Sequence, residues 1–249
     1  MNNFLKKFLD IILIVLVLVV FFLLIKAGFW LLLQVFNAGD PFSFANYYDP
    51  VHMGFSKLRV INEDIVQLSM GFGTHGHQDM EILSYVLQGD IAHKDSQGNV
   101  RTLPAGEFQL MSAGSGITHS EYNHSNTGIL QFLQIWIEPN IKGQAPGYQQ
   151  KDFEQNEGLT HVISPNGAND TLQVKQDIHL YQLILSAGQS THLTSTLPNQ
   201  YLHLISGKLD INGFEIGPGD GFKITDEVKL VFKSIGEENV KALIFELPY

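Results

Sequence analysis

The chain of 249 residues contains no cysteine. This absence excludes disulfides, thiolate zinc sites, iron–sulfur clusters and a cysteine nucleophile, so any bound metal must be held by other side chains. Arginine is almost absent as well, with only Arg59 and Arg101, and the formal net charge is −10. Binding to a nucleic-acid backbone requires clustered basic side chains. We therefore expect no nucleic-acid partner.

Long apolar runs are also absent from most of the chain, and the exception lies near the N-terminus. From Ile11 to Phe36 the sequence is apolar apart from Lys26, Gly28 and Gln34. A helix needs about 20 mainly apolar residues to cross a bilayer, and this stretch is longer. We therefore expect residues 1–37 to form a membrane anchor with a transmembrane helix.

The charges around this segment predict its orientation. Lys6 and Lys7 precede it, and the acids Asp40 and Asp49 follow it, so the positive-inside rule places the N-terminus in the cytoplasm and the rest of the chain outside. A cleaved signal peptide is less favoured because no site has small residues at both −1 and −3. If the segment is instead a wrongly assigned start of the reading frame, the protein is cytoplasmic.

The remainder of the chain predicts an all-β fold. Short runs rich in Val, Ile, Leu, Phe and Tyr alternate with Gly, Asn, Asp and Pro, which is typical of strands joined by tight turns. A weak internal repeat matches residues 85–91 to residues 203–209, which indicates two similar lobes. We place them at residues 38–158 and 159–249. The Gly-, Pro-, Gln- and Asn-rich stretch 142–170 is expected to be a linker.

A group of histidines and acids in the first lobe predicts a metal site. On a strand, residues i and i+2 share a face, so His75 pairs with His77 and His119 pairs with Glu121. Glu81 is expected on the same face as the first pair. Three imidazoles and a carboxylate suit Fe(II), Mn(II), Ni(II), Cu(II) or Zn(II). Without a cation, burial of this group would leave unpaired charge in the interior.

Other histidines are expected to play no part in such a site. His93 and His124 stand beside turn residues and are predicted to be solvated. In the second lobe His192 takes the place of His75, but Thr194 replaces His77. No histidine follows His203, so the second lobe has no counterpart of His119. Metal chemistry is therefore expected in the first lobe alone.

The first lobe resembles the pirin family of bicupins, which includes quercetin 2,3-dioxygenases. The motifs that support the resemblance are FSFANYYDP, LRVINED, GFGTHGHQDMEIL, GEFQLMSAGSGITHSEYN and QIWI, between Phe42 and Ile137. The second lobe resembles the degenerate C-terminal cupin of that family. The resemblance implies two tandem cupin barrels, each a double-stranded β-helix or jelly roll. The family's usual beginning is replaced here by the apolar segment.

The resemblance also implies the ligands and the chemistry. The metal, most often Fe(II) in this family, would be held by His75, His77, His119 and Glu121, and Glu81 would be only a neighbour of the site. The substrate would be a small flavonol such as quercetin, cleaved by O2 with loss of carbon monoxide, with Glu121 as the candidate catalytic base.

Two other functions remain open from the sequence. The chain could be an iron-dependent regulatory protein that binds a protein partner without turnover, because that role needs the same ligands. A metal-independent sugar- or acid-binding cupin is less favoured, since the full ligand set is present. A cavity for an aromatic substrate beside the metal would distinguish the enzyme from the regulator.

Overall fold

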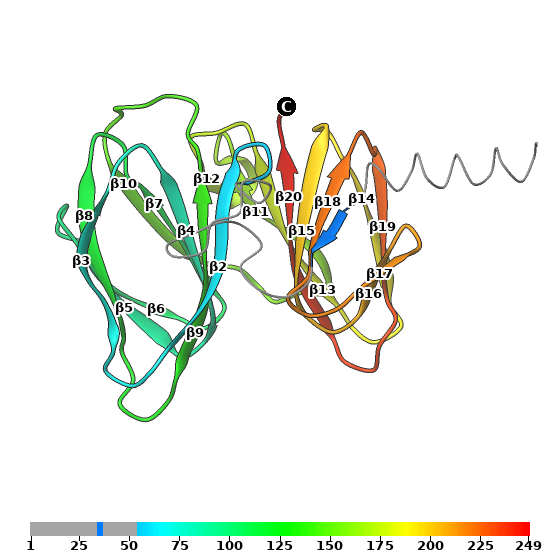
Figure 1. Ribbon diagram of the computed structural model, residues 1–249, viewed down its shortest axis with the longest axis horizontal. Coiled ribbons are helices and arrows are strands. Elements are labelled where there is room, and N and C mark those ends of the chain that lie inside the picture. Colours follow the sequence, from blue (N-terminus) through cyan, green and yellow to red (C-terminus); the bar gives the residue numbers. More distant parts are fainter. Residues whose placement is uncertain (1–33, 37–53) are drawn as a thin grey trace, which may run out of the picture.

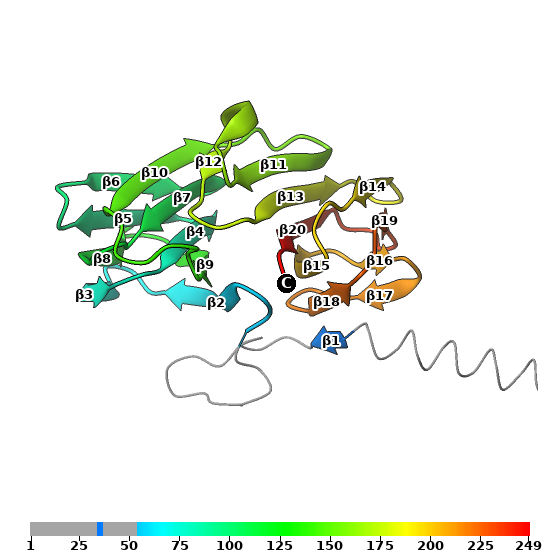
Figure 2. The same cartoon turned by 90° about the horizontal axis from the view of Figure 1, so that it is seen from above.

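The computed structural model describes residues 34–36 and 54–249, and these fold into two β-sandwich units that lie side by side (Figures 1 and 2). Within this described part the only helical element is a single 3₁₀ turn, η1 (Ala168–Asp170). The prediction of an all-β chain with two barrel units is therefore confirmed.

Each unit is built from two facing sheets. The first unit has a five-stranded sheet in the order β10-β7-β4-β9-β2 and a four-stranded sheet in the order β3-β8-β5-β6. The strands of the first sheet are β2 (Leu58–Val66), β4 (Glu81–Gln88), β7 (Glu107–Ser112), β9 (Leu130–Ile137) and β10 (Gly147–Asp152). Those of the second are β3 (Gly71–His77), β5 (Asp90–Asp95), β6 (Val100–Pro104) and β8 (Ile117–Asn123).

The second unit repeats this plan with a larger sheet. Its order is β1-β18-β15-β20-β13-β11-β12, and the facing sheet is β14-β19-β16-β17. The larger sheet contains β1 (Gln34–Phe36), β11 (Gly158–Ser164), β12 (Leu172–Gln173), β13 (His179–Leu185), β15 (Asn199–Ser206), β18 (Gly221–Thr225) and β20 (Val240–Leu247). The smaller contains β14 (Ser190–Thr194), β16 (Leu209–Ile211), β17 (Phe214–Ile216) and β19 (Lys229–Ser234).

Strand β20 shows why the two units pack together. Its sequence VKALIFEL is buried at nearly every position, which is the pattern of a strand covered on both faces. Ala242 and Ile244 contribute to the core inside the second unit. Leu243 and Phe245 face the other way and join a core that also contains Leu83 of the first unit. Burial of this shared apolar surface holds the units together.

The predicted repeat has a counterpart in the backbone. Gly89 and Gly207 both follow the long central strand of their unit and have φ of 77° and 80°. A Cβ at Gly89 would lie 2.7 Å from the carbonyl oxygen of Ile129, and one at Gly207 would lie 2.8 Å from that of Asn239. Only glycine combines positive φ with so close an approach at low cost, so both lobes keep the same turn.

One sequence prediction is corrected by the strands. The stretch 142–170 is not a linker, because it contains β10, which pairs with β7, and β11, which pairs with β13. Tertiary pairing here overrides a composition typical of loops. The lobe boundary predicted after residue 158 falls at the first residue of β11.

The predicted transmembrane helix lies largely outside the described residues, since residues 1–33 are not among them. Its last three residues were predicted wrongly, because Gln34–Phe36 form strand β1 and pair with β18. Backbone pairing with a sheet edge replaces the helical bonding that a continuous span would need. In the part of the chain that the structure describes, no helix has the length and apolarity to cross a bilayer.

Candidate metal centre

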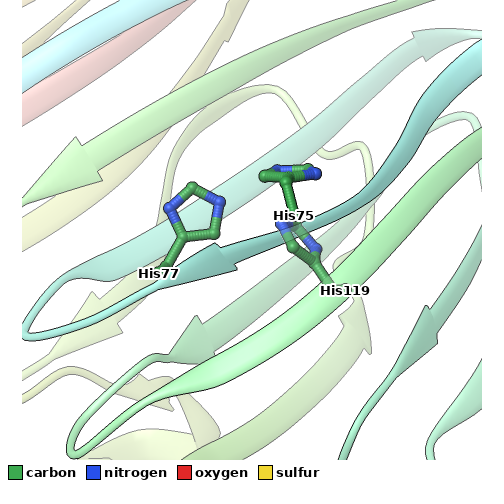
Figure 3. Close-up of side chains that lie close together, drawn as sticks. All are labelled: His75, His77 and His119. Carbon is green, nitrogen blue, oxygen red and sulfur yellow. The ribbon is translucent and has the colours of Figure 1, made fainter.

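Three histidines converge on the inner face of the smaller sheet of the first unit. His75 and His77 belong to β3 and His119 to β8, with His75 directly opposite His119 in the register of the two strands. Figure 3 shows the three rings turned toward one another. Their centroids lie 4.4 to 4.9 Å apart, and one ring nitrogen from each lies within 4.8 Å of the others. Such a spacing suits three ligands of one cation.

Three ring nitrogens of this cluster are buried without a protein partner. His75 Nδ1 lies 2.8 Å from the carbonyl oxygen of Gly73 and must donate its proton there, which leaves Nε2 as a free acceptor. Nε2 of His77 and both ring nitrogens of His119 are buried with no hydrogen-bond partner. Buried polar atoms are nearly always paired, so these nitrogens fit a cation. The carbonyl of Gly73 would then orient His75 from behind.

Burial keeps two of these histidines, His77 and His119, unprotonated at neutral pH. Burial, with a smaller contribution from His75, lowers the pKa of His77 to about 4. Burial and the neighbouring histidines lower the pKa of His119 to about 3. A metal binds the unprotonated imidazole, so the pocket holds both rings in the form that a metal requires.

Glu121 follows His119 by two residues on β8 and shares its inward direction. Its carboxylate accepts hydrogen bonds on both oxygens, from Ser84 Oγ to Oε1 at 3.2 Å and from Gln134 Nε2 to Oε2 at 2.8 Å. Burial raises the pKa of Glu121 to about 7, and the charge of Asp64 adds to the rise while the two hydrogen bonds oppose it. The group is therefore poised to gain or lose a proton near neutrality.

A second group of possible ligands overlaps the first at His119. It contains His93, His119 and Glu121, whose nearest ligand atoms also lie within 4.8 Å of one another. Glu121 thus clusters with His119 and His93, whereas His75 and His77 cluster with His119. Of the four side chains predicted as ligands, His119 belongs to both groups, His75 and His77 to the first, and Glu121 to the second.

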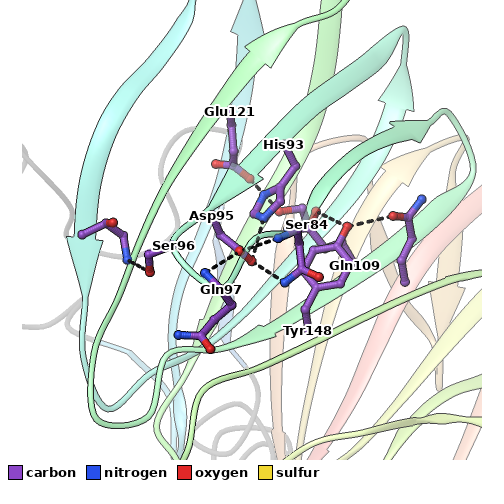
Figure 4. A network of polar contacts seen from close by, with 11 residues as sticks. Ser84, His93, Asp95, Ser96, Gln97, Gln109, Glu121 and Tyr148 are labelled. Atoms are coloured by element: carbon purple, nitrogen blue, oxygen red, sulfur yellow. Dashed lines mark hydrogen bonds and ion pairs between the residues drawn. The ribbon is translucent and has the colours of Figure 1, made fainter.

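His93 was wrongly predicted to be solvated. It is only 2% exposed and stands directly opposite Glu121 in the register of β5 and β8. Its Nε2 lies 3.4 Å from Oδ2 of Asp95, and backbone and side-chain groups of the following turn hold Asp95 in place (Figure 4). Strand β5 extends to Asp95, so the i, i+2 pattern of Ile91, His93 and Asp95 was the signal for an inward histidine. His124 is exposed, as predicted.

Glu81 does not share a face with His75 and His77, which corrects another prediction. Between His77 and Glu81 the chain leaves the smaller sheet and enters the larger one as β4, so strand alternation does not extend across the break. The buried carboxylate of Glu81 accepts hydrogen bonds from Ser112 Oγ at 2.9 Å and from the backbone N–H of Lys175 at 3.2 Å. It belongs to neither group of possible ligands.

The interior of the second unit has a different character. His192 is exposed on β14, while its neighbour Leu193 packs into the apolar core. Leu230 fills the position on β19 that faces Leu193. Although His192 aligns with His75 in the sequence repeat, it points out of the barrel. Both groups of possible metal ligands found among the described residues lie in the first unit.

An open pocket borders the histidine cluster. It encloses about 500 Å³ and is lined by Gly76, His77, Gln78, Ser96, Gly116, Ile117 and Thr118. Trp136 lies with its ring nearly perpendicular to that of His77, at 5.1 Å between centroids. Pockets for small organic ligands enclose about 300–1,000 Å³, so this volume is sufficient for an aromatic molecule.

Comparison with known proteins agrees with these observations. Residues 29–137 match the family model described as Pirin, and residues 161–247 match the Quercetinase C-terminal cupin domain. The chain is 47% identical over 213 residues to the Quercetin 2,3-dioxygenase of Escherichia coli K12, covering 85% of this chain and 91% of that protein.

Two solved structures are similar as well. The crystal structure of YhhW from Escherichia coli has a TM-score of 0.81 and 43% identity, and covers 87% of this chain and 91% of that one. The structure of the bacterial pirin YhhW in complex with nickel(II) has a TM-score of 0.80 and 43% identity, with coverages of 87% and 92%. This chain, with its two β-barrel units and its inward-facing histidine cluster, belongs to the pirin family.

Proposed function

We propose that the protein is a metal-dependent dioxygenase that cleaves a flavonol of the quercetin type with O2. The observation that supports it most directly is the convergence of three imidazoles, of which His77 and His119 have buried nitrogens with no hydrogen-bond partner. His75, His77, His119 and Glu121 would hold the ion. The name of the Escherichia coli relative supports the substrate class, and the pocket beside His77 provides room for it.

The ion would be Fe(II), although Mn(II), Ni(II), Cu(II) and Zn(II) also suit three imidazoles and a carboxylate. Its chemistry, when bound, is to polarise the 3-hydroxyl of the flavonol and to bring the substrate together with O2. The protein supplies the ligands, and burial keeps His77 and His119 in the unprotonated form that a metal binds.

Glu121 is the candidate base for the 3-hydroxyl proton. Burial raises the pKa of this carboxyl group, and a raised pKa makes a carboxylate a stronger base. Ser84 and Gln134 fix its two oxygens from the facing sheet. Trp136, beside His77, offers an aromatic surface against which a flat substrate can pack.

The second candidate is a metal-dependent regulatory protein that acts without turnover. It is favoured by exposed apolar side chains close to the site, since Met70 is 61%, Phe72 is 40% and Tyr122 is 42% exposed. Exposed apolar groups of this kind are typical of surfaces that meet a partner protein.

Metal loading combined with a turnover assay distinguishes the two candidates. The full chain is stripped with a chelator, reloaded with Fe(II), Mn(II) or Ni(II), and incubated with quercetin under O2 while carbon monoxide is measured. We expect turnover in at least one metal-loaded form. His77→Ala should lose both the bound metal and the turnover. His124→Ala, which removes an exposed histidine, is the control. Stoichiometric metal with no turnover of any flavonol would favour the regulator.

The cellular location remains a prediction from the sequence. An anchor formed by residues 11–33 would leave the β-barrel units outside the cytoplasm, and a wrongly assigned start would leave them inside. External protease added to sealed right-side-out vesicles should digest the barrels in the first case. Complete protection of the barrels from the protease would overturn the prediction that they lie outside the cytoplasm.

A further inference from the structure

His119 needs a second partner whichever of its ring nitrogens binds a metal. Both nitrogens are buried and have no hydrogen-bond partner among the described residues. When one nitrogen of a neutral imidazole is a ligand, the other carries the ring proton. A ligating histidine almost always donates that proton to an acceptor in the protein or to water. The interior of the first unit must therefore supply an acceptor for the second ring N–H of His119.

The neighbours of His119 lie on two different strands. In the smaller sheet of the first unit, β8 stands between β3 and β5 (Figure 2). On one side, β3 carries the other two histidines of the cluster. On the other side, β5 places Asp95 directly opposite His119 and His93 directly opposite Glu121. The proposed ligands on β3 and the polar side chains of β5 therefore approach His119 from opposite sides.

The carboxylate of Asp95 is already occupied. Its Oδ1 accepts the backbone N–H groups of Gln97 and Asn99 at 2.9 and 3.0 Å. Its Oδ2 accepts Nδ2 of Asn99 at 2.8 Å and lies 3.4 Å from Nε2 of His93. Each carboxylate oxygen has two lone pairs, so both oxygens are fully used. Asp95 therefore fixes His93 and leaves no lone pair for His119.

His93 has an acceptor that no described residue uses. Its side chain is fully buried, and its Nε2 faces the carboxylate of Asp95. A carboxylate only accepts hydrogen bonds, so Nε2 carries the ring proton and Nδ1 has the free lone pair. This Nδ1 is buried and has no partner within the described part of the chain. Figure 4 shows His93 joined to Asp95 in the polar network that also contains Glu121.

The ring of His93 is held close to His119. Its centroid lies 5.5 Å from that of His119 and 5.1 Å from that of Tyr148. The nearest ligand atoms of His93, His119 and Glu121 lie within 4.8 Å of one another, a separation that a small turn of a ring or one bridging water closes. Glu121 is the poorer acceptor, because both its oxygens already accept hydrogen bonds and the proposed function assigns its carboxylate to the ion.

We propose that His93 is a positioning residue of the metal centre, whose Nδ1 accepts the second ring N–H of His119 while Asp95 holds His93 from behind. The inference rests on the metal binding of the proposed function and adds to it the residue that orients one ligand. In this role His93 supports a ligand and is not one itself. Loss of the acceptor would leave a buried donor unpaired and weaken metal binding with every ligand still present.

Calorimetric titration of the chelator-stripped full chain with Ni(II) tests the proposal. His93→Asn keeps a polar atom at the position of Nδ1, whereas His93→Gln keeps one at the position of Nε2 and His93→Phe keeps neither. We expect His93→Gln and His93→Phe to lower the affinity by about 10- to 100-fold, the usual cost of an outer-shell partner, and His93→Asn to lower it clearly less. Tyr148→Phe is the control, because it keeps the ring beside His93 and removes only a hydroxyl that donates to Gln109 and Gln150.

The ring N–H of His119 gives a second readout, which does not depend on turnover. In the Co(II)-loaded chain the ring N–H protons of ligating imidazoles give NMR signals shifted by the paramagnetic ion, and a hydrogen-bonded proton exchanges slowly with water. We expect one slowly exchanging signal of the unsubstituted chain to be lost in His93→Gln and kept in His93→Asn. A role of His93 in packing alone would not separate these two variants.

Circular dichroism shows whether each variant is folded, and His93→Phe replaces His93→Gln if the latter fails to fold. Equal Ni(II) affinity of His93→Gln and the unsubstituted chain would overturn the proposal. Equal losses in His93→Asn and His93→Gln would overturn it too, because the acceptor at Nδ1 would then make no difference. If the unsubstituted chain binds no Ni(II), the proposed function fails together with this inference.

Discussion

Nε2 of Gln134 on β9 donates a hydrogen bond of 2.8 Å to Oε2 of Glu121 on β8, across the interior of the first barrel. The bond joins the two sheets of the unit at the point where the proposed ligands meet. The two residues lie on opposite sheets, so the position of the carboxylate depends on how the sheets face each other. Figure 4 shows Glu121 within this interior network.

Substitution of Gln134 is expected to weaken metal binding without removing a ligand. Gln134→Leu leaves Oε2 of Glu121 without its donor, and loss of such an outer-shell partner lowers metal affinity by about 10- to 100-fold. Calorimetric titration with Ni(II) measures the change. Gln131→Leu is the matched control, because Gln131 lies on the same strand but donates to Glu63 at the surface. Equal affinities in both variants would show that Gln134 does not support the site.

Glu81 is expected to stabilise the fold and not the metal. Glu81→Ala removes the acceptor for Ser112 Oγ and for the N–H of Lys175, which lies between β12 and β13 of the second unit. Buried donors left unpaired cost about 1–3 kcal/mol each. Urea unfolding should show a loss of this order, while Ni(II) affinity stays within twofold. A large fall in affinity would place Glu81 among the ligands after all.

Stability is expected to depend on pH through His203 of the second unit. His203 is 3% exposed, and burial lowers its pKa to about 4. Between pH 6.5 and 4 the unfolded chain therefore binds a proton that the folded chain does not, so stability falls as the pH drops through this window. The contribution is roughly 3 kcal/mol.

His203→Leu should flatten this pH dependence in metal-free protein. The free energy of unfolding is measured in urea at several pH values from 7 to 4, and the difference between variant and parent should grow in the variant's favour toward pH 4. His124→Leu, at an exposed site, should leave the slope as it was. An unchanged slope in His203→Leu would mean that this histidine titrates normally in the folded state.

Gly89 is expected to tolerate no side chain. Gly89→Ala forces a Cβ to within 2.7 Å of the Ile129 carbonyl oxygen at a φ of 77°, so strain and collision both act. Gly98→Ala is the matched comparison, because Gly98 has a φ of 91° with open space around it. We expect Gly98→Ala to cost about 1 kcal/mol and Gly89→Ala clearly more, measured by thermal unfolding. Equal costs would show that the turn moves to make room.

The metal cluster was largely predictable because strand alternation is a local property. The spacing of His75 and His77, and that of His119 and Glu121, places each pair on one face as soon as the segments form strands. The structure groups His75 and His77 with His119, and groups Glu121 with His119 and His93. The same local rule would have identified His93 if the strand predicted from the sequence had reached Asp95, where β5 ends in the structure.

Local rules failed where the chain changes sheets or where a distant strand decides. Glu81 was misplaced because three residues between His77 and β4 carry the chain from one sheet to the other. Residues 147–152, with the composition of a loop, became β10 because the edge of β7 was available for pairing. His192 faces outward although the repeat aligns it with His75.

By itself, the sequence determined the all-β class, the two-lobed plan and the pairs of side chains that share a strand face. These follow from the alternation of apolar and polar residues along the strands and from turn residues such as Gly89 and Gly207. Only the tertiary structure decided which pairs meet. The contact of Gln134 with Glu121 joins two strands of different, facing sheets, and the packing of whole sheets sets such distances.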